Sequence, residues 1–335
     1  MGDQTAAIVG AGNIGRVHAT AYREAGARVV AVCDVDERRA AALATEVGAT
    51  AYTSVERMLD AGPFSVVSVC TPPSGHQVVA EAVARRGIAL LCEKPLAHSV
   101  AAAEAIVAAV AAGGAPCMTG FCHRFHPPVL AIKEQLAAGA IGAPIFFRNR
   151  FAGRFGGVEQ TWFADPALSG GGALMDTSVH SVDLYRYLIG EITEVAARLS
   201  TGQPGLAGAR VEHSGVLLVG GPTGVPGVIE ASWVTPAGGS VLVVYGTEGT
   251  LSVDYGAGDF GVAYVQRADD PAPRELPLRG PSRFTAEIGY LLECVASGRA
   301  PSPDAHDGLR AVQVLMAAYA AAGGATATLP PPPHA

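Results

Sequence analysis

Lys94 is the residue whose type most needs a chemical explanation. It stands between an apolar run and a proline in the stretch LLCEKPLAHS, residues 90–99. The chain has 23 Lys and Arg residues, yet only Lys94 and Lys133 are lysines. Arginine stays protonated in proteins, whereas the pKa of a lysine moves readily on burial. The use of lysine here therefore indicates a specific catalytic or binding role.

A second candidate is the stretch SGGGALMDTSVHSVDLYRYLIG, residues 169–190. Asp176 and His180 are four residues apart, so on a helix they share one face, and Asp183 follows three residues later. A carboxylate beside an imidazole orients the ring and raises its basicity, as a proton-abstracting residue requires. A purely structural ion pair has the same spacing, so both interpretations stay open. The glycines at 170–172 would let the backbone approach another group closely at the helix start.

The N-terminal segment carries a dinucleotide-binding pattern, G-x-G-x-x-G, between an expected strand and helix. Gly10 permits the tight turn, Gly12 lets the backbone approach a pyrophosphate, and Gly15 lets helix and strand pack closely. The pyrophosphate would lie at the helix N-terminus, beside Asn13 and Ile14. We therefore expect these five residues to bind the cofactor.

The next expected strand ends on Asp34, nineteen residues after Gly15. An acid at this place accepts hydrogen bonds from the ribose hydroxyls of NAD and repels the 2′-phosphate of NADP. Arg38 and Arg39 follow and would favour NADP, but Asp34 would still face that phosphate. We expect NAD rather than NADP.

Further candidates follow the strands expected at 65–70 and 89–92. Ligands of open α/β sheets bind at the carboxyl ends of the strands, and residues that leave this edge are candidates for cofactor contact. They are Thr71, Pro72, His76, Glu93 and Lys94. His76 could equally be an ordinary residue at a helix start, so both roles stay open for it.

Expected strands alternate with expected helices over the first ~120 residues, and these elements would position the candidate residues. Short β-branched runs separated by helical stretches predict an α/β fold with a doubly wound parallel sheet. The expected strands are 6–9, 28–33, 65–70, 89–92 and 117–120, and the helices are 36–47, 77–86 and 99–112.

The pattern changes after residue 121. We expect helices at 127–138, 174–188, 284–296 and 304–322, an alternating segment at 143–155, and strands at 194–199, 213–219, 228–234, 241–245, 250–255 and 262–267. These six or so strands predict a largely antiparallel sheet with one face in need of a partner. The predicted domains are 1–123 for NAD binding and 124–335 for substrate binding and oligomerisation, with the final helix able to pack back on the first domain.

Composition limits the class of protein. A chain of 335 residues with 49% hydrophobic and 16% charged residues is typical of a globular enzyme of two domains. A net charge of −7 without a basic block argues against nucleic acid and anionic membranes as partners. No apolar run approaches the roughly 20 residues of a membrane span, and no signal-peptide pattern is visible, so we expect a cytoplasmic protein.

Six cysteines are spread over the chain without a disulfide or zinc pattern, so we expect reduced thiols in the interior. Cys117, Cys122, His123 and His126 have the spacing C-x4-C-H-x-x-H. This spacing does not match known zinc clips, so we expect no metal.

Taken in order, these motifs make the chain similar to the Gfo/Idh/MocA family, which includes glucose–fructose oxidoreductase and inositol 2-dehydrogenase. The resemblance runs from residue 8 to about 320. The matching features are the glycine loop, Thr71-Pro72, Glu93-Lys94-Pro95, Arg124-Phe125 before Pro127, the glycines at 170–172, Asp176-x-x-x-His180-x-x-Asp183 and the late VYGTEGTL.

The resemblance implies a Rossmann domain followed by an open-faced sheet that pairs with another subunit, giving a homodimer or homotetramer. It also implies a catalytic set formed by Lys94, Asp176 and His180, and a cis peptide bond between Lys94 and Pro95. Members of the family act on many sugars and cyclitols, so the resemblance does not identify the substrate.

The expected reaction is reversible NAD-linked oxidation of a secondary alcohol on a sugar or cyclitol ring. Substrate contacts are expected from Arg124, Asn149, Arg150, Trp162 and Thr177. Trp162 could stack on a sugar ring or belong to the core, and Arg124 could brace the domain junction. Two other classes stay open: a glycoside hydrolase that oxidises its substrate transiently, and a non-catalytic NAD-binding sensor.

Overall fold

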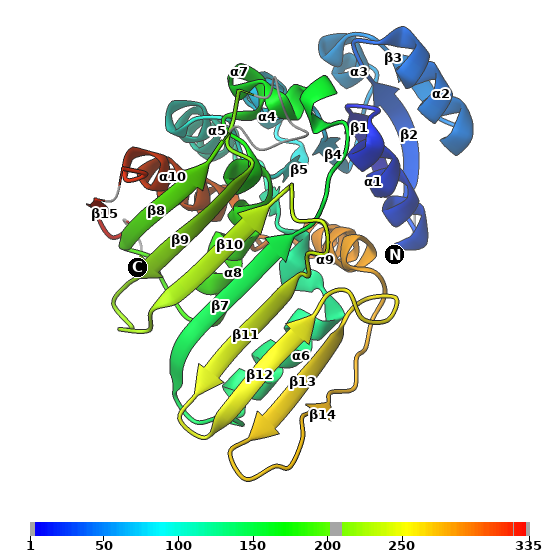
Figure 1. The fold of residues 1–335 in the computed structure, drawn as a ribbon. Helices are drawn as coiled ribbons and strands as arrows, with labels where there is room; N and C mark the ends of the chain where they lie inside the picture. Colours follow the sequence, from blue (N-terminus) through cyan, green and yellow to red (C-terminus); the bar gives the residue numbers. More distant parts are fainter. Residues whose placement is uncertain (1–3, 202–209, 324, 333–335) are drawn as a thin grey trace. The chain divides into compact units, whose positions relative to one another are not determined.

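The computed structural model describes residues 4–201, 210–323 and 325–332. The chain divides into two units (Figure 1). Unit 1 consists of Met1–Cys122 and Arg283–Val312, and unit 2 consists of His123–Ser282 and Gln313–Ala335. The first break falls one residue before the boundary expected from the sequence, and a later segment of the chain returns to unit 1.

Unit 1 contains a six-stranded sheet in the order β3-β2-β1-β4-β5-β6, and every neighbouring pair is parallel. This is the doubly wound arrangement expected from the alternating pattern. The strands are β1 (Thr5–Val9), β2 (Arg28–Cys33), β3 (Thr50–Tyr52), β4 (Val66–Val69), β5 (Ala89–Glu93) and β6 (Cys117–Gly120).

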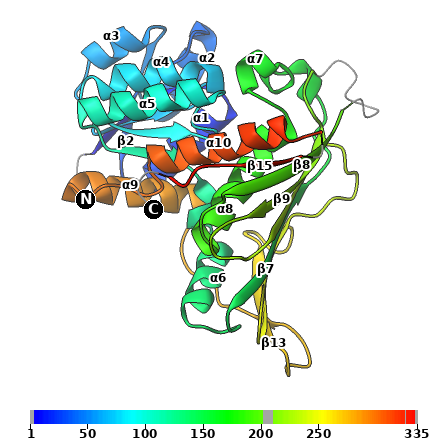
Figure 2. The same ribbon diagram turned by 90° about the vertical axis from the view of Figure 1, so that its left-hand side faces the viewer.

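Helices cover both faces of this sheet. Figure 2 shows α4 and α5 side by side on one face and α9 on the other. Gln4 donates to the carbonyl of Leu292, and Thr285 donates to Glu24 at 2.5 Å, so α9 is tied to the start of β1 and the end of α1. The helices are α1 (Asn13–Glu24), α2 (Glu37–Val47), α3 (Val55–Asp60), α4 (Pro73–Ala84), α5 (Val100–Gly113), α9 (Arg283–Ser297) and α10 (Ala305–Ala320), the last of which continues into unit 2.

Unit 2 contains a nine-stranded sheet in the order β14-β13-β12-β11-β7-β10-β9-β8-β15, which is antiparallel except for the parallel pair of β7 and β10. The strands are β7 (Pro144–Ala152), β8 (Glu194–Ser200), β9 (Ser214–Gly220), β10 (Gly227–Ser232), β11 (Val241–Gly246), β12 (Gly249–Asp254), β13 (Val262–Arg267), β14 (Arg274–Glu275) and β15 (Thr326–Thr328).

The helices of unit 2 lie on one face of its sheet, and Figure 1 shows α6 and α8 behind the strands. The alternation of buried and exposed residues along β9 and β11 follows from this one-sided cover. The helical segments are α6 (Pro127–Ala137), α7 (Pro166–Ser169), the π-helical η4 (Leu174–Ser178) and α8 (Val179–Leu188), with short 3-10 turns at η1 (Cys122–Phe125), η2 (Val158–Gln160) and η3 (Trp162–Ala164).

The structure confirms the fold class and corrects its details. The second sheet has nine strands where we expected about six, and it includes a parallel pair. The strands β14 and β15 have only two and three residues, and β3 has three, so they are too short to leave a periodic signal. The peptide between Lys94 and Pro95 is cis, as expected.

The six cysteines are all buried free thiols, as expected. Within the described ranges, no helix is both long enough and apolar enough to span a membrane.

Candidate active site

The glycine loop of unit 1 has the shape that its sequence predicts. Gly10 has φ +101°, and a Cβ there would lie 2.5 Å from the carbonyl group of Cys70. A Cβ on Gly15 would lie 2.0 Å from the carbonyl oxygen of Gly10, whereas a Cβ on Gly12 would meet nothing within 4 Å. Gly10 and Gly15 are therefore required for packing, and Gly12 leaves open space at the start of α1.

Asp34 connects this loop to the end of β2. Its Oδ2 accepts the Ala11 amide at 2.8 Å, and its Oδ1 accepts the Asp36 amide at 2.9 Å. A carboxylate has about four lone-pair sites, so acceptor capacity remains for ribose hydroxyl groups. The geometry fits the role that the sequence predicts for Asp34.

The residues at this edge fit a bound dinucleotide. Gly12 is the N-cap of α1 and has no side chain that could accept a hydrogen bond from the first amides of that helix. Thr71 Oγ1 is buried and has no hydrogen-bond partner among the described residues. Free helix amides bind phosphate, and an orphaned hydroxyl can bind a ligand group. Asn13, Ile14 and Thr71 would hold the cofactor here.

His76 ties two loops of the edge together. Its Nε2 lies 2.8 Å from the carbonyl oxygen of Thr71, and its Nδ1 lies 3.0 Å from that of Pro95 and 3.2 Å from that of Leu96. The ring is buried, and burial lowers the pKa of His76. Both ring nitrogens of His76 therefore lie within hydrogen-bond distance of backbone carbonyl groups in the interior of unit 1.

Glu93 is buried against His18 of α1, a residue that sequence reasoning did not select. Glu93 Oε1 lies 3.0 Å from His18 Nε2, and Glu93 Oε2 accepts the Lys94 amide at 3.1 Å. The other ring nitrogen of His18 lies 3.0 Å from Ser68 Oγ. The carboxylate of Glu93 thus has hydrogen-bond partners inside unit 1.

Burial and neighbouring groups act in opposite directions on the pKa values of this pair. Burial opposes the charge on His18, but the Cys70 sulfur and the Glu93 carboxylate raise the pKa of His18 well above its usual 6.5. Burial likewise opposes the charge on Glu93, and His18 still lowers the pKa of that carboxyl. Glu93 and His18 therefore form a closely coupled buried pair within unit 1, and Glu93 also accepts the Lys94 amide.

The two lysines of the chain have different surroundings. Lys133 donates to the carbonyl of Tyr187 at 2.6 Å, and its ammonium lies 3.7 Å from the centre of the Tyr187 ring. Burial, with a smaller effect from Arg124, lowers the pKa of Lys133. Lys94 instead follows the last residue of β5, at the carboxyl edge of the parallel sheet. The structure gives Lys133 a packing role and places Lys94 at the ligand-binding edge.

In unit 2, Asp176 lies in the π-helical turn η4 and His180 in the first turn of α8, which continues it. The expected helix at 174–188 is therefore present, but its first turn is wider than an α-helix. Single π-helical turns are rare and often occur at functional sites.

Asp176 accepts hydrogen bonds from two side chains, of which the sequence had indicated only Thr177 as a site residue. Its Oδ2 accepts the indole N–H of Trp233 at 3.2 Å and the hydroxyl of Thr177 at 3.2 Å. Trp233 is 2% exposed and packs in a cluster that includes Ala173 and Ala231. Trp233 lies just beyond β10 and far from Asp176 in sequence, so nothing in the local pattern could have indicated the contact. Thr177, an expected substrate residue, orients Asp176.

His180 is packed among rings in unit 2. Its ring centre lies 4.6 Å from that of His123, in an edge-to-face arrangement. His123 in turn lies 4.9 Å from Phe151 and 5.4 Å from Tyr255. This aromatic surrounding limits the positions that the His180 imidazole can adopt. The sequence pattern did not indicate this contact of His123, whose spacing only excluded a zinc clip.

Arg124 and Asp183 form a buried pair. Arg124 Nε lies 2.9 Å and 3.1 Å from the two carboxylate oxygens of Asp183, and Nη2 lies 2.5 Å from Oδ1. The side chains are 9% and 1% exposed. The pair ties the segment before α6 to the middle of α8, so Arg124 has a bracing role within unit 2.

Asn149 and Arg150 are neighbours on β7 and lie on opposite faces of the sheet. Asn149 is fully buried on the helix-covered face, and both atoms of its amide lack a partner among the described residues. Arg150 donates to the carbonyl of Gly239 at 2.8 Å. One substrate molecule cannot contact both side chains, and the orphaned amide makes Asn149 the better candidate.

Trp162 is partly buried and stacks on Phe163 at a ring distance of 3.8 Å. Phe163 packs against the cluster that contains Trp233. Of the two roles that stayed open for Trp162, these contacts favour a place in the aromatic packing of unit 2.

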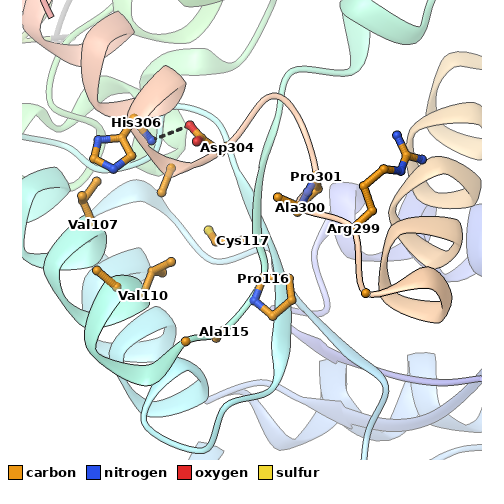
Figure 3. A pocket seen from close by; sticks show the side chains of 14 residues that line it. Val107, Val110, Ala115, Pro116, Cys117, Arg299, Ala300, Pro301, Asp304 and His306 are labelled. Carbon is orange, nitrogen blue, oxygen red and sulfur yellow. Dashed lines mark hydrogen bonds between the residues drawn. The ribbon is translucent and has the colours of Figure 1, made fainter. Parts of the chain in front are cut away.

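A cavity of about 350 Å³ lies elsewhere in unit 1, between the end of α5 and the segment that connects α9 to α10. Figure 3 shows its mostly apolar wall, with Val107, Val110 and Pro116 facing the Asp304 end of α10. Cys117 starts β6, so the cavity lies at the amino edge of the parallel sheet, opposite Lys94. It is separate from the edge where a dinucleotide binds.

The parallel sheet and its glycine loop define an NAD-binding Rossmann unit, the cofactor-binding part of an oxidoreductase. Comparison with known proteins gives the particular family. Residues 5–121 match the family described as "Oxidoreductase family, NAD-binding Rossmann fold", and residues 129–252 match "GFO/IDH/MocA C-terminal domain". The chain belongs to the Gfo/Idh/MocA family of oxidoreductases, which includes NAD-binding sugar and cyclitol dehydrogenases.

Three relatives illustrate the range of the family. Inositol 2-dehydrogenase of Rubrobacter xylanophilus is 31% identical over 322 residues, which cover 93% of this chain and 89% of that protein. D-apiose dehydrogenase of Paraburkholderia graminis is 29% identical over 332 residues, covering 94% and 87%. The crystal structure of aldose-aldose oxidoreductase from Caulobacter crescentus is 28% identical, with a TM-score of 0.90 and coverage of 98% and 100%.

Proposed function

We propose that the protein catalyses the reversible NAD-linked oxidation of a secondary alcohol on a sugar or cyclitol ring. Its relatives include enzymes named for inositol, a cyclitol, and for apiose, a sugar. The observation that carries the proposal is the turn that leads into His180, where the Trp233 indole and the Thr177 hydroxyl hold the Asp176 carboxylate in one orientation. A held carboxylate next to a histidine is what a general base requires.

The proposed roles follow from the chemistry of each side chain. His180 accepts the hydroxyl proton of the substrate as the C–O bond gains double-bond character. Asp176 stabilises the imidazolium that forms. Lys94 donates a hydrogen bond to the same substrate oxygen and stabilises its developing negative charge, which is often the largest single term in catalysis. NAD held at the glycine loop and Asp34 would supply the acceptor for the hydride of the carbinol carbon.

Substrate recognition is proposed for Asn149. Its amide offers two donors and an acceptor that the protein leaves without partners in the described residues. A site built to hydrogen-bond a hydroxyl group discriminates strongly against analogues that lack it. Substrate recognition by Asn149 can be separated from catalysis by kinetics. Asn149→Ala should raise KM for the sugar or cyclitol more than it lowers kcat.

The proposal is tested by mixing the purified protein with NAD⁺ and a panel of inositols, aldoses, amino sugars and anhydrosugars. We expect NADH absorbance to rise with at least one of them. Release of sugar from a glycoside without net NADH would favour the transient-oxidation hydrolase. NAD binding with neither outcome would favour a sensor and contradict the proposed dehydrogenase.

The cofactor choice gives a separate prediction. The wild-type protein should prefer NAD to NADP by at least roughly tenfold in kcat/KM, or about 1.4 kcal/mol. Asp34→Ser should narrow this gap, because it removes the carboxylate that repels a 2′-phosphate. Steady-state kinetics with both cofactors measure the ratio. Equal kcat/KM values for the wild type would contradict the role of Asp34.

The open face of the second sheet suggests the oligomeric state. α6 and α8 cover one face, and the other carries Phe146, Val216, Leu218 and Tyr245, of which Leu218 is 57% exposed. Apolar side chains gathered on a sheet face usually mark an interface. We propose a homodimer or homotetramer that forms through this face.

For this interface, Leu218→Glu should shift the protein toward the monomer, because it places a charge among apolar side chains. Light scattering at micromolar concentration measures the change. Val78→Glu is the matched control, since Val78 is a 70% exposed residue on α4 in unit 1. A monomeric wild type would rule out the interface.

A further inference from the structure

Glu212 accepts hydrogen bonds from three consecutive backbone amides at the start of η4. Its carboxylate oxygens lie 3.0 Å and 2.9 Å from the Gly172 amide nitrogen, and Oε1 lies 2.9 Å from that of Leu174. Its own carbonyl oxygen lies 3.0 Å from the Ala173 amide nitrogen. The first amides of a helix have no partners within the helix, so one residue satisfies all three of these groups.

The carboxylate is buried and has one further donor. Tyr319, near the end of α10 in the part that belongs to unit 2, donates its hydroxyl to Glu212 Oε1 at 2.8 Å. Glu212 is 5% exposed. Burial raises the pKa of its carboxyl, while hydrogen bonds from Leu174 and Tyr319 act against this change. A carboxylate at this place is also favoured by the positive end of the helix dipole.

The glycines at 170–172 provide independent support. A Cβ on Gly172 would lie 1.9 Å from the carbonyl oxygen of Glu212, and a Cβ on Gly171 would lie 2.0 Å from the hydroxyl oxygen of Tyr319. Such distances are far below any real Cβ contact. The sequence predicted that these glycines allow a close approach. The structure identifies the approaching groups as Glu212 and Tyr319.

The anchored residues determine the path of the helix that follows. The Asp176 amide donates to the carbonyl of Gly172 at 2.9 Å, so the backbone of Asp176 is placed one hydrogen bond from the anchor. η4 runs directly into α8, which begins at Val179 and carries His180. A shift of the anchor would therefore displace both Asp176 and His180.

We propose that Glu212 is a positioning residue for catalysis, which holds the start of η4 and thereby sets the placement of Asp176 and His180. Tyr319 assists by holding the carboxylate. This inference rests on the proposed function for the roles of Asp176 and His180. Glu212 itself touches only the protein, and its effect reaches the substrate through the helix.

A graded set of variants tests the proposal. Tyr319→Phe removes one donor and leaves the anchor in place. Glu212→Gln keeps one acceptor oxygen but turns an amide group toward the Gly172 N–H, and Glu212→Met keeps the length and removes both oxygens. We expect kcat to fall by about 3-fold, 10-fold and 100-fold respectively, because small displacements of reacting groups carry costs of this order. Glu230→Gln is the matched control, since Glu230 pairs with Arg148 away from η4.

Two readouts separate positioning from general destabilisation. KM for NAD should stay within about twofold of the wild type in each variant, because the loss is in the transition state and not in cofactor binding. Hydrogen–deuterium exchange should speed up in peptides covering 172–182 and stay unchanged in those covering 283–297. If Glu212→Met does not fold, the other two variants still give the series.

The proposal is overturned if Glu212→Gln keeps wild-type kcat, or if exchange at 172–182 does not change. Parallel loss of kcat and NAD binding would also count against it, since that indicates general unfolding. A wild type that oxidises no polyol would instead defeat the proposed function, while the exchange experiment would still decide whether Glu212 anchors the helix.

Discussion

Replacing Lys94 with methionine should lower kcat by roughly 10²–10³-fold while NAD affinity stays nearly unchanged. The physical reason is the loss of the donor that would stabilise negative charge on the substrate oxygen. Lys94→Arg should fail almost as badly, because a guanidinium keeps the charge but is too broad to take the place of a compact ammonium. Steady-state kinetics on a confirmed substrate and fluorescence titration with NADH measure the two effects.

The other lysine of the chain supplies the matched control. Lys133 contacts the carbonyl and ring of Tyr187, so Lys133→Arg should keep kcat close to that of the wild type. His180→Ala should lower kcat strongly, and its effect should combine less than additively with that of Lys94→Met if both act on one proton transfer. If Lys94→Arg kept more than about half of the wild-type kcat, the proposed role of Lys94 would be wrong.

The second large effect concerns stability. Arg124→Met should lower the free energy of unfolding of unit 2 by about 3–5 kcal/mol, because it leaves the buried carboxylate of Asp183 without its cation. The change is measured by urea unfolding followed by circular dichroism. Arg148→Met is the control: its pair with Glu230 is partly exposed, and such pairs contribute only about 0–1 kcal/mol.

A double variant distinguishes loss of charge pairing from loss of packing. Arg124→Met combined with Asp183→Leu removes both charges, so it should be more stable than Arg124→Met alone. If the double variant were instead as unstable as the sum of the single variants, the pair would not act as a unit. Arg124 would then contribute through its packing alone.

The placement of the candidate cofactor residues at one edge of the sheet was predictable from sequence, because these residues follow strands. In a parallel sheet every strand ends at the same edge, so an apolar run followed by Thr71 or Lys94 already places those residues there. Gly10 and Gly15 were predictable for the same reason, since a strand–turn–helix connection restricts what its backbone can accommodate. The protein contacts of His76 and Glu93 were not predictable, because position in the chain does not determine where a side chain points.

The remaining contacts could not be read from a local pattern. His18 meets Glu93, Trp233 meets Asp176, and Glu212 meets Gly172 across separations of 75, 57 and 40 residues. Periodicity describes which face of an element is buried but not which residue it meets. One indirect signal did exist: three consecutive glycines before a helix imply bulky neighbours, although they do not identify them.

The path of the chain between its two units has a consequence for gene recombination. It passes from one unit to the other after Cys122, after Ser282 and after Val312, and the last crossing lies inside α10. A simple N-terminal fusion that ends at residue 122 would therefore lack α9, whose Thr285 and Leu292 are bonded to Glu24 and Gln4. A chimera that joins this NAD-binding unit to the substrate unit of a relative needs three splice points, and the third must preserve the register of a continuous helix. An insertion or deletion near residue 312 would thus shift the register of α10 between its part in unit 1 and its part in unit 2, which carries Tyr319.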